Sequence, residues 1–291
     1  MEKKLLLVVV IVLVGLCGSV ALALDPMGPP AAGLKQGQWS AGIDYSSSDM
    51  DLKVDGKYSW YEWGQNGSYW EDLGSGKFEE KAKGVKVNKI YANIGYGIMD
   101  NWDAFVRLGG ANGDLGDSIE DMGENFDSDY VFAYGFGTRV TFWQDADLKV
   151  GGLFQMSWAN GLNDAEHGTY VEENGSAYVE SWAMSGKVDL TEIQIAIGPT
   201  WTPSEGFSVY GGPFLHFVSG QFDAKFSYTE GESYNYVYTE TGKSSGDITE
   251  DSCFGGYIGA QVQLGENACV SGEWMTTGDA EAFGVQGCVK F

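Results

Sequence analysis

Apolar and polar residues alternate with a period of two along most of the chain after residue 35. Ile193, Ile195 and Ile197, for example, are separated by polar or small residues, and residues 130–142 and 148–158 show the same split. A period of two is typical of β-strands with one apolar face. The pattern predicts ten strands, at residues 36–54, 85–98, 102–110, 129–143, 148–158, 185–201, 207–222, 253–264, 268–277 and 280–291.

Most of these strands are longer than those of soluble proteins, which average about 5–6 residues, and a tilted strand of about ten residues crosses a membrane. Short turns are expected at 99–101, 144–147, 202–206 and 265–267, and long loops at 55–84, 111–128, 159–184 and 223–252. The sequence therefore predicts an all-β fold: a closed, antiparallel, up-and-down transmembrane β-barrel with short periplasmic turns and long outer loops. Another interpretation of 55–84 or 223–252 gives eight or twelve strands, and a soluble β-protein is the alternative fold.

Aromatic residues are expected at both ends of the outward apolar rows, where they would meet the two headgroup layers. One set lies near the short turns and the other near the long loops: Trp39, Trp102, Phe142, Trp201 and Phe207, then Tyr130, Trp158, Phe217, Phe254 and Phe283.

The first residues have the pattern of a secretory signal peptide. Lys3 and Lys4 precede an apolar run, and Ala21 and Ala23 provide small residues for cleavage, so residues 1–23 are expected to be removed. A membrane anchor is the alternative, and a lipid attached at Cys17 is a weaker one because Leu16 is large. Residues 24–35, with three prolines, are expected to be a periplasmic lead-in segment, and 36–291 the barrel.

The composition of the chain argues against one class of partner. The chain contains 43 glycines, and its formal charge of −24 argues against nucleic acid as a partner. Residues 111–129 hold seven acids and no base, and 159–184 are also acidic. An acidic rim would weakly favour cations over anions and could collect divalent cations. A solvated surface is the preferred explanation, because the spacing of a calcium-binding loop is absent.

The face opposite the lipid row would line the lumen and carries charged residues. Two interpretations stay open: a filled interior held by ion pairs, or a narrow pore for water, ions or small solutes. Many lumen positions are glycine, which would provide either room for solute or tight packing against large neighbours. The expected lumen-lining charges are Asp103, Arg107, Arg139, Lys149, Glu192, His216, Glu273 and Lys290.

Two cysteines are predicted to pair. With Gly278-Asp279 as a two-residue turn, Cys269 lies directly opposite Cys288 on the lumen face, and an oxidising compartment would allow a disulfide. Cys253 would stay unpaired.

An enzyme is not expected. The chain has two histidines, and neither His167, near Asp164 and Glu166, nor His216 matches a catalytic spacing. Phosphate-binding loops, Cys-x-x-Cys pairs and zinc motifs are absent from the sequence. No catalytic residue, metal ligand or cofactor is therefore predicted.

The last strand carries an apolar row that ends on the C-terminal residue: Phe283, Val285, Val289 and Phe291. This row resembles the assembly signal of Gram-negative outer-membrane β-barrel proteins, from which Gly287 departs because that row is usually bulkier. The resemblance implies an outer-membrane location, with the lipid bilayer and the barrel-assembly machinery as partners. The expected role is structural or surface-directed, or that of a narrow passive, porin-like channel. An adhesin or receptor acting through the acidic loops is the alternative, ahead of an outer-membrane hydrolase or a secreted soluble protein.

Overall fold

The computed structural model describes residues 24–64, 70–116, 126–173, 177–232 and 236–291. The expected signal peptide, residues 1–23, lies outside this part of the chain. Within it, no helix is long and apolar enough to cross a membrane. The strands are β1 (Trp39–Trp63), β2 (Trp70–Met99), β3 (Trp102–Gly116), β4 (Phe126–Asp127), β5 (Val131–Asp145), β6 (Leu148–Glu173), β7 (Ala177–Ser204), β8 (Phe207–Glu232), β9 (Tyr236–Thr249), β10 (Phe254–Leu264), β11 (Ala268–Thr277) and β12 (Ala280–Lys290).

Ten of these strands close into a ring in which every pairing is antiparallel. The order is β1, β2, β3, β5, β6, β7, β8, β10, β11 and β12, and β12 pairs with β1 along Ser40–Met50. The predicted closed up-and-down barrel of ten strands is therefore confirmed. Its outward face is apolar and exposed, as at Ile43, Phe132, Ile197 and Ile258. A closed ring that satisfies its own backbone hydrogen bonds and presents an apolar outer face is suited to lipid.

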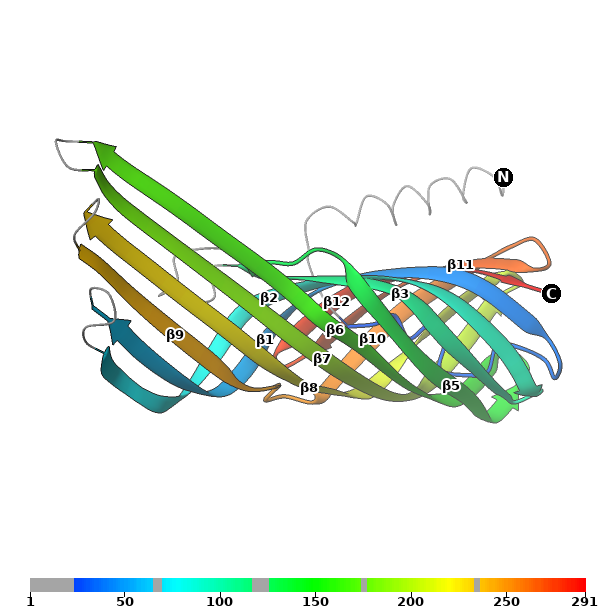
Figure 1. Ribbon diagram of the computed structural model, residues 1–291. Coiled ribbons are helices and arrows are strands. Elements are labelled where there is room, and N and C mark those ends of the chain that lie inside the picture. The colour runs from blue at the N-terminus through cyan, green and yellow to red at the C-terminus, as the bar shows by residue number, and fades with distance from the viewer. Residues whose placement is uncertain (1–23, 65–69, 117–125, 174–176, 233–235) are drawn as a thin grey trace.

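The wall continues past one end of the ring as a six-stranded sheet, which we call the extension (Figure 1). There β9 lies between β8 and β1, which gives the order β2, β1, β9, β8, β7, β6. The predicted long loops at 55–84, 159–184 and 223–252 are therefore wrong, since most of these residues form strands. The sequence pattern of these strands is not a simple alternation of apolar and polar residues. One face carries charges, and the other mixes aromatic residues with glycines and acids.

Large aromatic rings lie over glycines on neighbouring strands. Tyr210 opposes Gly259 and Phe214 opposes Gly255, and in both pairs a side chain at the glycine would collide with the ring. Tyr58 and Gly76 repeat the arrangement in the extension. At these positions the glycines serve tight packing against large neighbours, which was one of the two explanations for their abundance.

The regular pairing of the wall is interrupted at two positions. The first is a bulge on β2, where Lys83 and Gly84 oppose Asp51 of β1. The face pattern of β1 continues through it, so Met50 and Leu52 both face the lumen. At the second position, Pro213, the pairing of β8 with β7 is interrupted, because proline has no N–H to donate, while its pairing with β10 continues.

Residues 24–34 lie inside the barrel, and we call them the N-terminal plug. Residues 24–35 were expected to be a periplasmic lead-in segment, but Leu24, Asp25 and Met27 are fully buried within the barrel. Glycines in the wall make room for the plug. A side chain at Gly151 would meet the backbone of Ala31, and one at Gly284 would meet Pro26. These glycines explain how an extended segment fits within a ten-stranded wall.

Candidate functional site

Arg107 of β3 is the centre of a buried charge cluster in the lumen. Its guanidinium lies 3.2 Å from Asp25 of the plug and 2.9 Å from Asp44 of β1. It also donates a hydrogen bond of 2.9 Å to the carbonyl oxygen of Pro26. The side chain is 2% exposed, so this charge depends on its partners for stabilisation. A residue expected to line the lumen therefore holds the plug.

Lys89 of β2 connects the cluster to β7 across the lumen. Its ammonium lies 3.2 Å from Asp25 and 2.5 Å from Glu192 of β7. Glu192 in turn lies 3.5 Å from His216, whose other ring nitrogen is 2.7 Å from Glu250. Glu192 and His216 were expected in the lumen, whereas Lys89 and Asp44 were missed. Both could have been found, because Lys89 shares the parity of the lumen residue Tyr91 and Asp44 alternates with the outward Ile43.

Glu273 of β11 binds the plug backbone. Its carboxylate accepts hydrogen bonds from the N–H groups of Met27, at 2.5 Å, and Gly28, at 2.7 Å. The Tyr210 hydroxyl donates a third, at 3.0 Å. Arg139 donates to the carbonyl oxygen of Met27 at 3.1 Å. An acid and a base thus satisfy backbone groups that burial would otherwise leave without partners.

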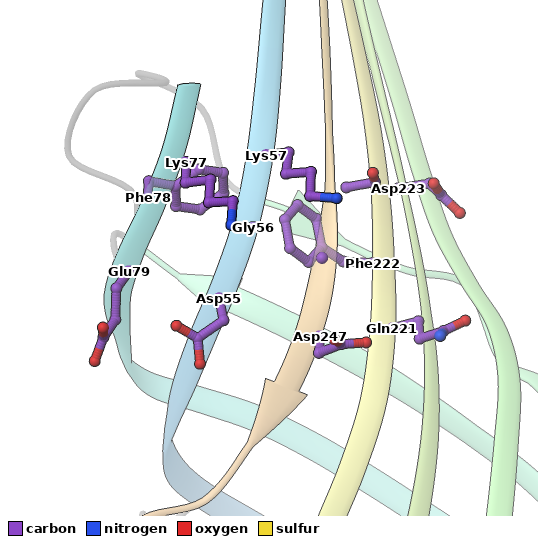
Figure 2. Close-up of a pocket in the computed structure, with 12 residues that line it drawn as sticks. Asp55, Gly56, Lys57, Lys77, Phe78, Glu79, Gln221, Phe222, Asp223 and Asp247 are labelled. Atoms are coloured by element: carbon purple, nitrogen blue, oxygen red, sulfur yellow. The ribbon is translucent and has the colours of Figure 1, made fainter. Parts of the chain in front are cut away.

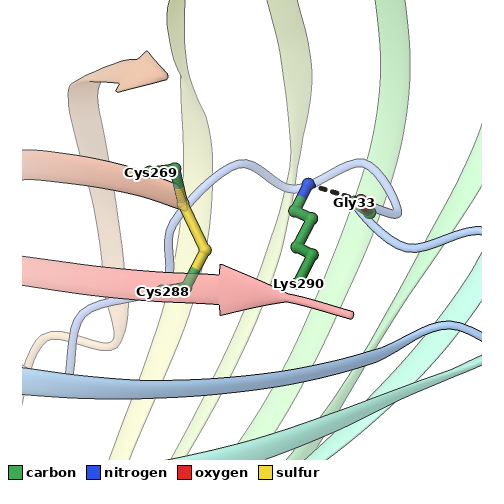
Figure 3. Close-up of a disulfide and its surroundings, with 4 residues drawn as sticks. All are labelled: Gly33, Cys269, Cys288 and Lys290. Carbon is green, nitrogen blue, oxygen red and sulfur yellow. Dashed lines mark hydrogen bonds between the residues drawn. A yellow bond between two sulfur atoms is a disulfide. The ribbon is translucent and has the colours of Figure 1, made fainter. Parts of the chain in front are cut away.

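The remaining predicted lumen charges lie at the end with the short turns. Asp103 accepts hydrogen bonds from the N–H groups of Gly33, at 2.7 Å, and Leu34, at 3.2 Å. Lys290 donates to the carbonyl oxygen of Gly33 at 2.8 Å (Figure 3). Together with Lys149, these two residues line a cavity of about 370 Å³ beside the plug. The structure therefore places all eight predicted lumen charges on the inner face, most of them in direct contact with residues 24–34.

A group of apolar side chains, which we call the apolar layer, lies in the lumen toward the extension. Its side chains come from β1, β2, β7 and β8 and are almost completely buried: Met50, Leu52, Val85, Val87, Leu190 and Val218. Most of the charge cluster lies between the plug and this layer.

Cys269 and Cys288 oppose each other on β11 and β12 and form a disulfide, with Cα atoms 5.2 Å apart (Figure 3). Cys253 is the free cysteine of the described chain. We expect alkylation without reductant, followed by peptide mass spectrometry, to label Cys253 alone. Labelling of all three cysteines in protein exported to an oxidising compartment would contradict the bond.

The row proposed as an assembly signal lies at the seam of the barrel. Val285 and Val289 oppose Tyr45 and Ala41 of β1, and Phe291 exchanges backbone hydrogen bonds of 3.0 Å with Trp39. Val289 and Phe291 are exposed on the outside. An assembly role for this row remains a prediction.

The inner face of the extension is concave and aromatic. The rings of Phe78 on β2 and Phe222 on β8 lie 6.0 Å apart, although β1 and β9 run between their strands at Gly56 and Gly246. The two rings meet because both lie over Gly56, which has no side chain to keep them apart. On the opposite, outer face at this level, alternate residues of the same four strands flank a groove of about 680 Å³: 55 and 57, 77 and 79, 221 and 223, 245 and 247 (Figure 2).

Farther from the ring, the inner face of the extension becomes acidic. Glu71, Glu62 and Glu240 oppose one another on β2, β1 and β9. In the next row, Glu230 opposes Glu180, and the Tyr228 hydroxyl lies 2.9 Å from each of these carboxylates. Desolvation, followed by the hydrogen bonds to Glu230 and Glu180, raises the pKa of Tyr228. Acidic residues were expected on this side of the membrane, but not their alignment on one face of a sheet.

Comparison with known proteins identifies no family. No family model matches the chain, and no curated protein matches it. Among the described residues, no group of three or more His, Cys, Asp or Glu side chains is arranged to hold a metal ion.

Solved structures with a similar course include three outer-membrane proteins. They are the protease OmpT from Escherichia coli (10% identity over 92% of this chain and 98% of that one, TM-score 0.34), an outer-membrane channel from Pseudomonas putida F1 (10%, 92% and 100%, TM-score 0.33) and the attachment protein Ail from Yersinia pestis (12%, 88% and 99%, TM-score 0.27). At these values the likenesses carry no argument about activity. The strand pairing by itself establishes that the chain is a closed, antiparallel β-barrel.

Proposed function

We propose that this protein is an integral outer-membrane barrel that does not conduct, and that it acts at the cell surface through its extension. The observation that carries the proposal is that most of the charged side chains in the lumen bind the N-terminal plug. Arg107, Glu273, Asp103 and Lys290 contact the protein's own residues 24–34, so the groups that would line a pore are occupied. The apolar layer, which lies between most of this cluster and the extension, adds buried side chains that ions would have to pass.

The outward surface supports the membrane location. Exposed Ile, Phe, Val and Trp side chains surround the ring, and a contiguous apolar surface of this kind is unfavourable in water. With the short turns on the periplasmic side, as outer-membrane barrels have them, the extension projects away from the cell. Residues 52–63 of β1 and 219–232 of β8 would then lie outside the membrane, where a partner can reach them.

Conductance tests the proposal against the narrow channel. The refolded full-length protein is inserted into a planar bilayer in 1 M KCl, and we expect a current no different from that of the bare membrane. Insertion is verified separately by protease protection of the ring strands in vesicles made from the same preparation. Discrete, ohmic current steps from verified, folded protein would overturn a closed barrel and favour the channel.

The proposed role includes no chemical reaction. His216, one of the two histidines, is buried between Glu192 and Glu250, and His167 lies in the extension strand β6. Both positions are compatible with structural roles.

A further inference from the structure

The extension separates its charges by face. The lysines Lys53 and Lys57 alternate with the inner residues Val54, Gly56 and Tyr58 on β1, and therefore lie on the outer face. Lys77 and Lys81 oppose these two lysines from β2, and Lys187, Lys225 and Lys243 lie on the same outer face of β7, β8 and β9. Lys83 lies in the β2 bulge. In the described part of the extension, no lysine or arginine in regular register shares the inner face.

The inner face, which we call the aromatic trough, carries aromatic and acidic side chains with small residues between them. Nearer the ring are aromatic residues, including Tyr58, Trp60, Phe78, Phe222 and Phe226; Tyr58 is 39% exposed, and Trp60 and Phe226 are partly exposed. The rings of Trp60 and Phe226 lie 5.5 Å apart over Gly242. Aromatic faces attract cations as well as apolar groups.

Farther out are the five glutamates Glu62, Glu71, Glu180, Glu230 and Glu240. Like charges directly opposite each other destabilise a sheet, yet here they occupy three adjacent strands in one row and two in the next. The Tyr228 hydroxyl has one proton and can donate it to only one of its two neighbouring carboxylates at a time. A cation bound at this level would relieve the repulsion.

The dimensions favour a chain-like ligand over a small ion. Along β7, the inner face runs from Leu190, beside the ring, to Glu180. At about 3.3 Å per residue, this is a distance of roughly 30 Å. Apolar and cationic groups would have to be joined over this length to contact both ends of the trough.

We propose that the aromatic trough binds a cationic amphipathic peptide. Its lysine or arginine side chains lie against the five glutamates, and its apolar side chains pack on the aromatic floor between Phe78 and Phe226. The proposal rests on the surface role given above, and it names the class of ligand for that role.

Binding of synthetic peptides tests it. The protein is placed in nanodiscs of zwitterionic phospholipid, and fluorescence anisotropy follows a labelled peptide of alternating lysine and leucine, with empty nanodiscs as the baseline. Two peptides of equal length serve as comparisons, one of glutamate and leucine and one of lysine and serine. We expect saturable binding of the lysine–leucine peptide, weaker binding of the lysine–serine peptide, and none of the glutamate–leucine peptide above baseline.

A pair of matched variants locates the site. Glu62→Gln with Glu240→Gln removes two opposed charges from the inner face of β1 and β9, and Asp55→Asn with Asp247→Asn removes two opposed charges from the outer face of the same strands. The inner-face variant is expected to bind the lysine–leucine peptide about tenfold more weakly or worse, since two charge-assisted contacts are lost. The outer-face variant is expected to bind within about twofold of the parent protein, because its two carboxylates lie on the face that the peptide does not contact. Each factor of ten in affinity corresponds to about 1.4 kcal/mol.

Equal affinity in the two variants would overturn the proposal, and so would equal binding of the three peptides or no binding at all. Circular dichroism and resistance to unfolding in detergent confirm that each variant is folded. Conductance separates the two levels of inference: a non-conducting barrel that ignores the peptides contradicts the ligand class alone, whereas current steps contradict the surface role itself.

Discussion

Replacing Arg107 with alanine is expected to lower the free energy of unfolding by about 3–5 kcal/mol, the usual cost of removing one partner from a buried ion pair. Asp25 and Asp44 would remain buried without the guanidinium that lies 3.2 and 2.9 Å from them. The carbonyl of Pro26 would also lose its donor. Urea unfolding in phospholipid vesicles, followed by tryptophan fluorescence, measures the change.

Lys187→Ala is the matched control, because it also breaks an ion pair, with Asp189 at 2.9 Å, but an exposed one in the extension. Exposed pairs contribute roughly 0.2–1 kcal/mol, so a small change is expected. If Arg107→Ala cost no more than Lys187→Ala, the buried cluster would not be stabilising the plug.

The second large effect concerns the wall glycine beneath the plug. A methyl group at Gly151 would meet the backbone of Ala31 and the carbonyl oxygen of Pro30, neither of which can rotate away. Gly151→Ala is therefore expected to displace the plug locally and to cost about 1–3 kcal/mol, as overpacking does. A reporter cysteine, Ala32→Cys in a Cys253→Ser background, is buried in the parent protein and should react with a water-soluble maleimide faster once Gly151 is replaced.

Gly256→Ala provides the comparison on β10. The nearest atom to its added methyl group would be the carbonyl oxygen of Gly212, at 4.0 Å, so neither stability nor labelling should change appreciably. Unaltered labelling in Gly151→Ala would show that the plug does not depend on the close approach at this position.

Alternation along the chain was sufficient to predict the ring and its inner charges. The parity of each strand follows from the apolar row that must face lipid, so Glu192 and Glu273 are assigned to the lumen without knowledge of their partners. The register at the Gly278-Asp279 turn brings Cys269 and Cys288 together for the same reason, because a two-residue turn determines every pairing of its hairpin.

The plug could not be predicted in this way. Residues 24–34 have no period, and three prolines give them the composition of a linker. What holds them is tertiary: Asp25 meets Lys89 and Arg107, and the backbone at Met27 meets Glu273. The extension was missed for a different reason. Its strands have water on one face and a mixture of glycine, aromatic and acidic residues on the other, so neither face reads as a continuous apolar row.

The plug joins opposite ends of the chain, and this imposes an order on assembly. Met27 and Gly28 are bound by a carboxylate 246 and 245 residues farther along, and Pro26 lies in the space left by Gly284 on the strand that closes against β1. The binding site for the first residues of the plug is therefore incomplete until the β11–β12 hairpin has formed. Contacts of such long separation form slowly because a large loop must close first. We therefore expect the plug to enter the lumen late in folding, after β12 has paired with β1.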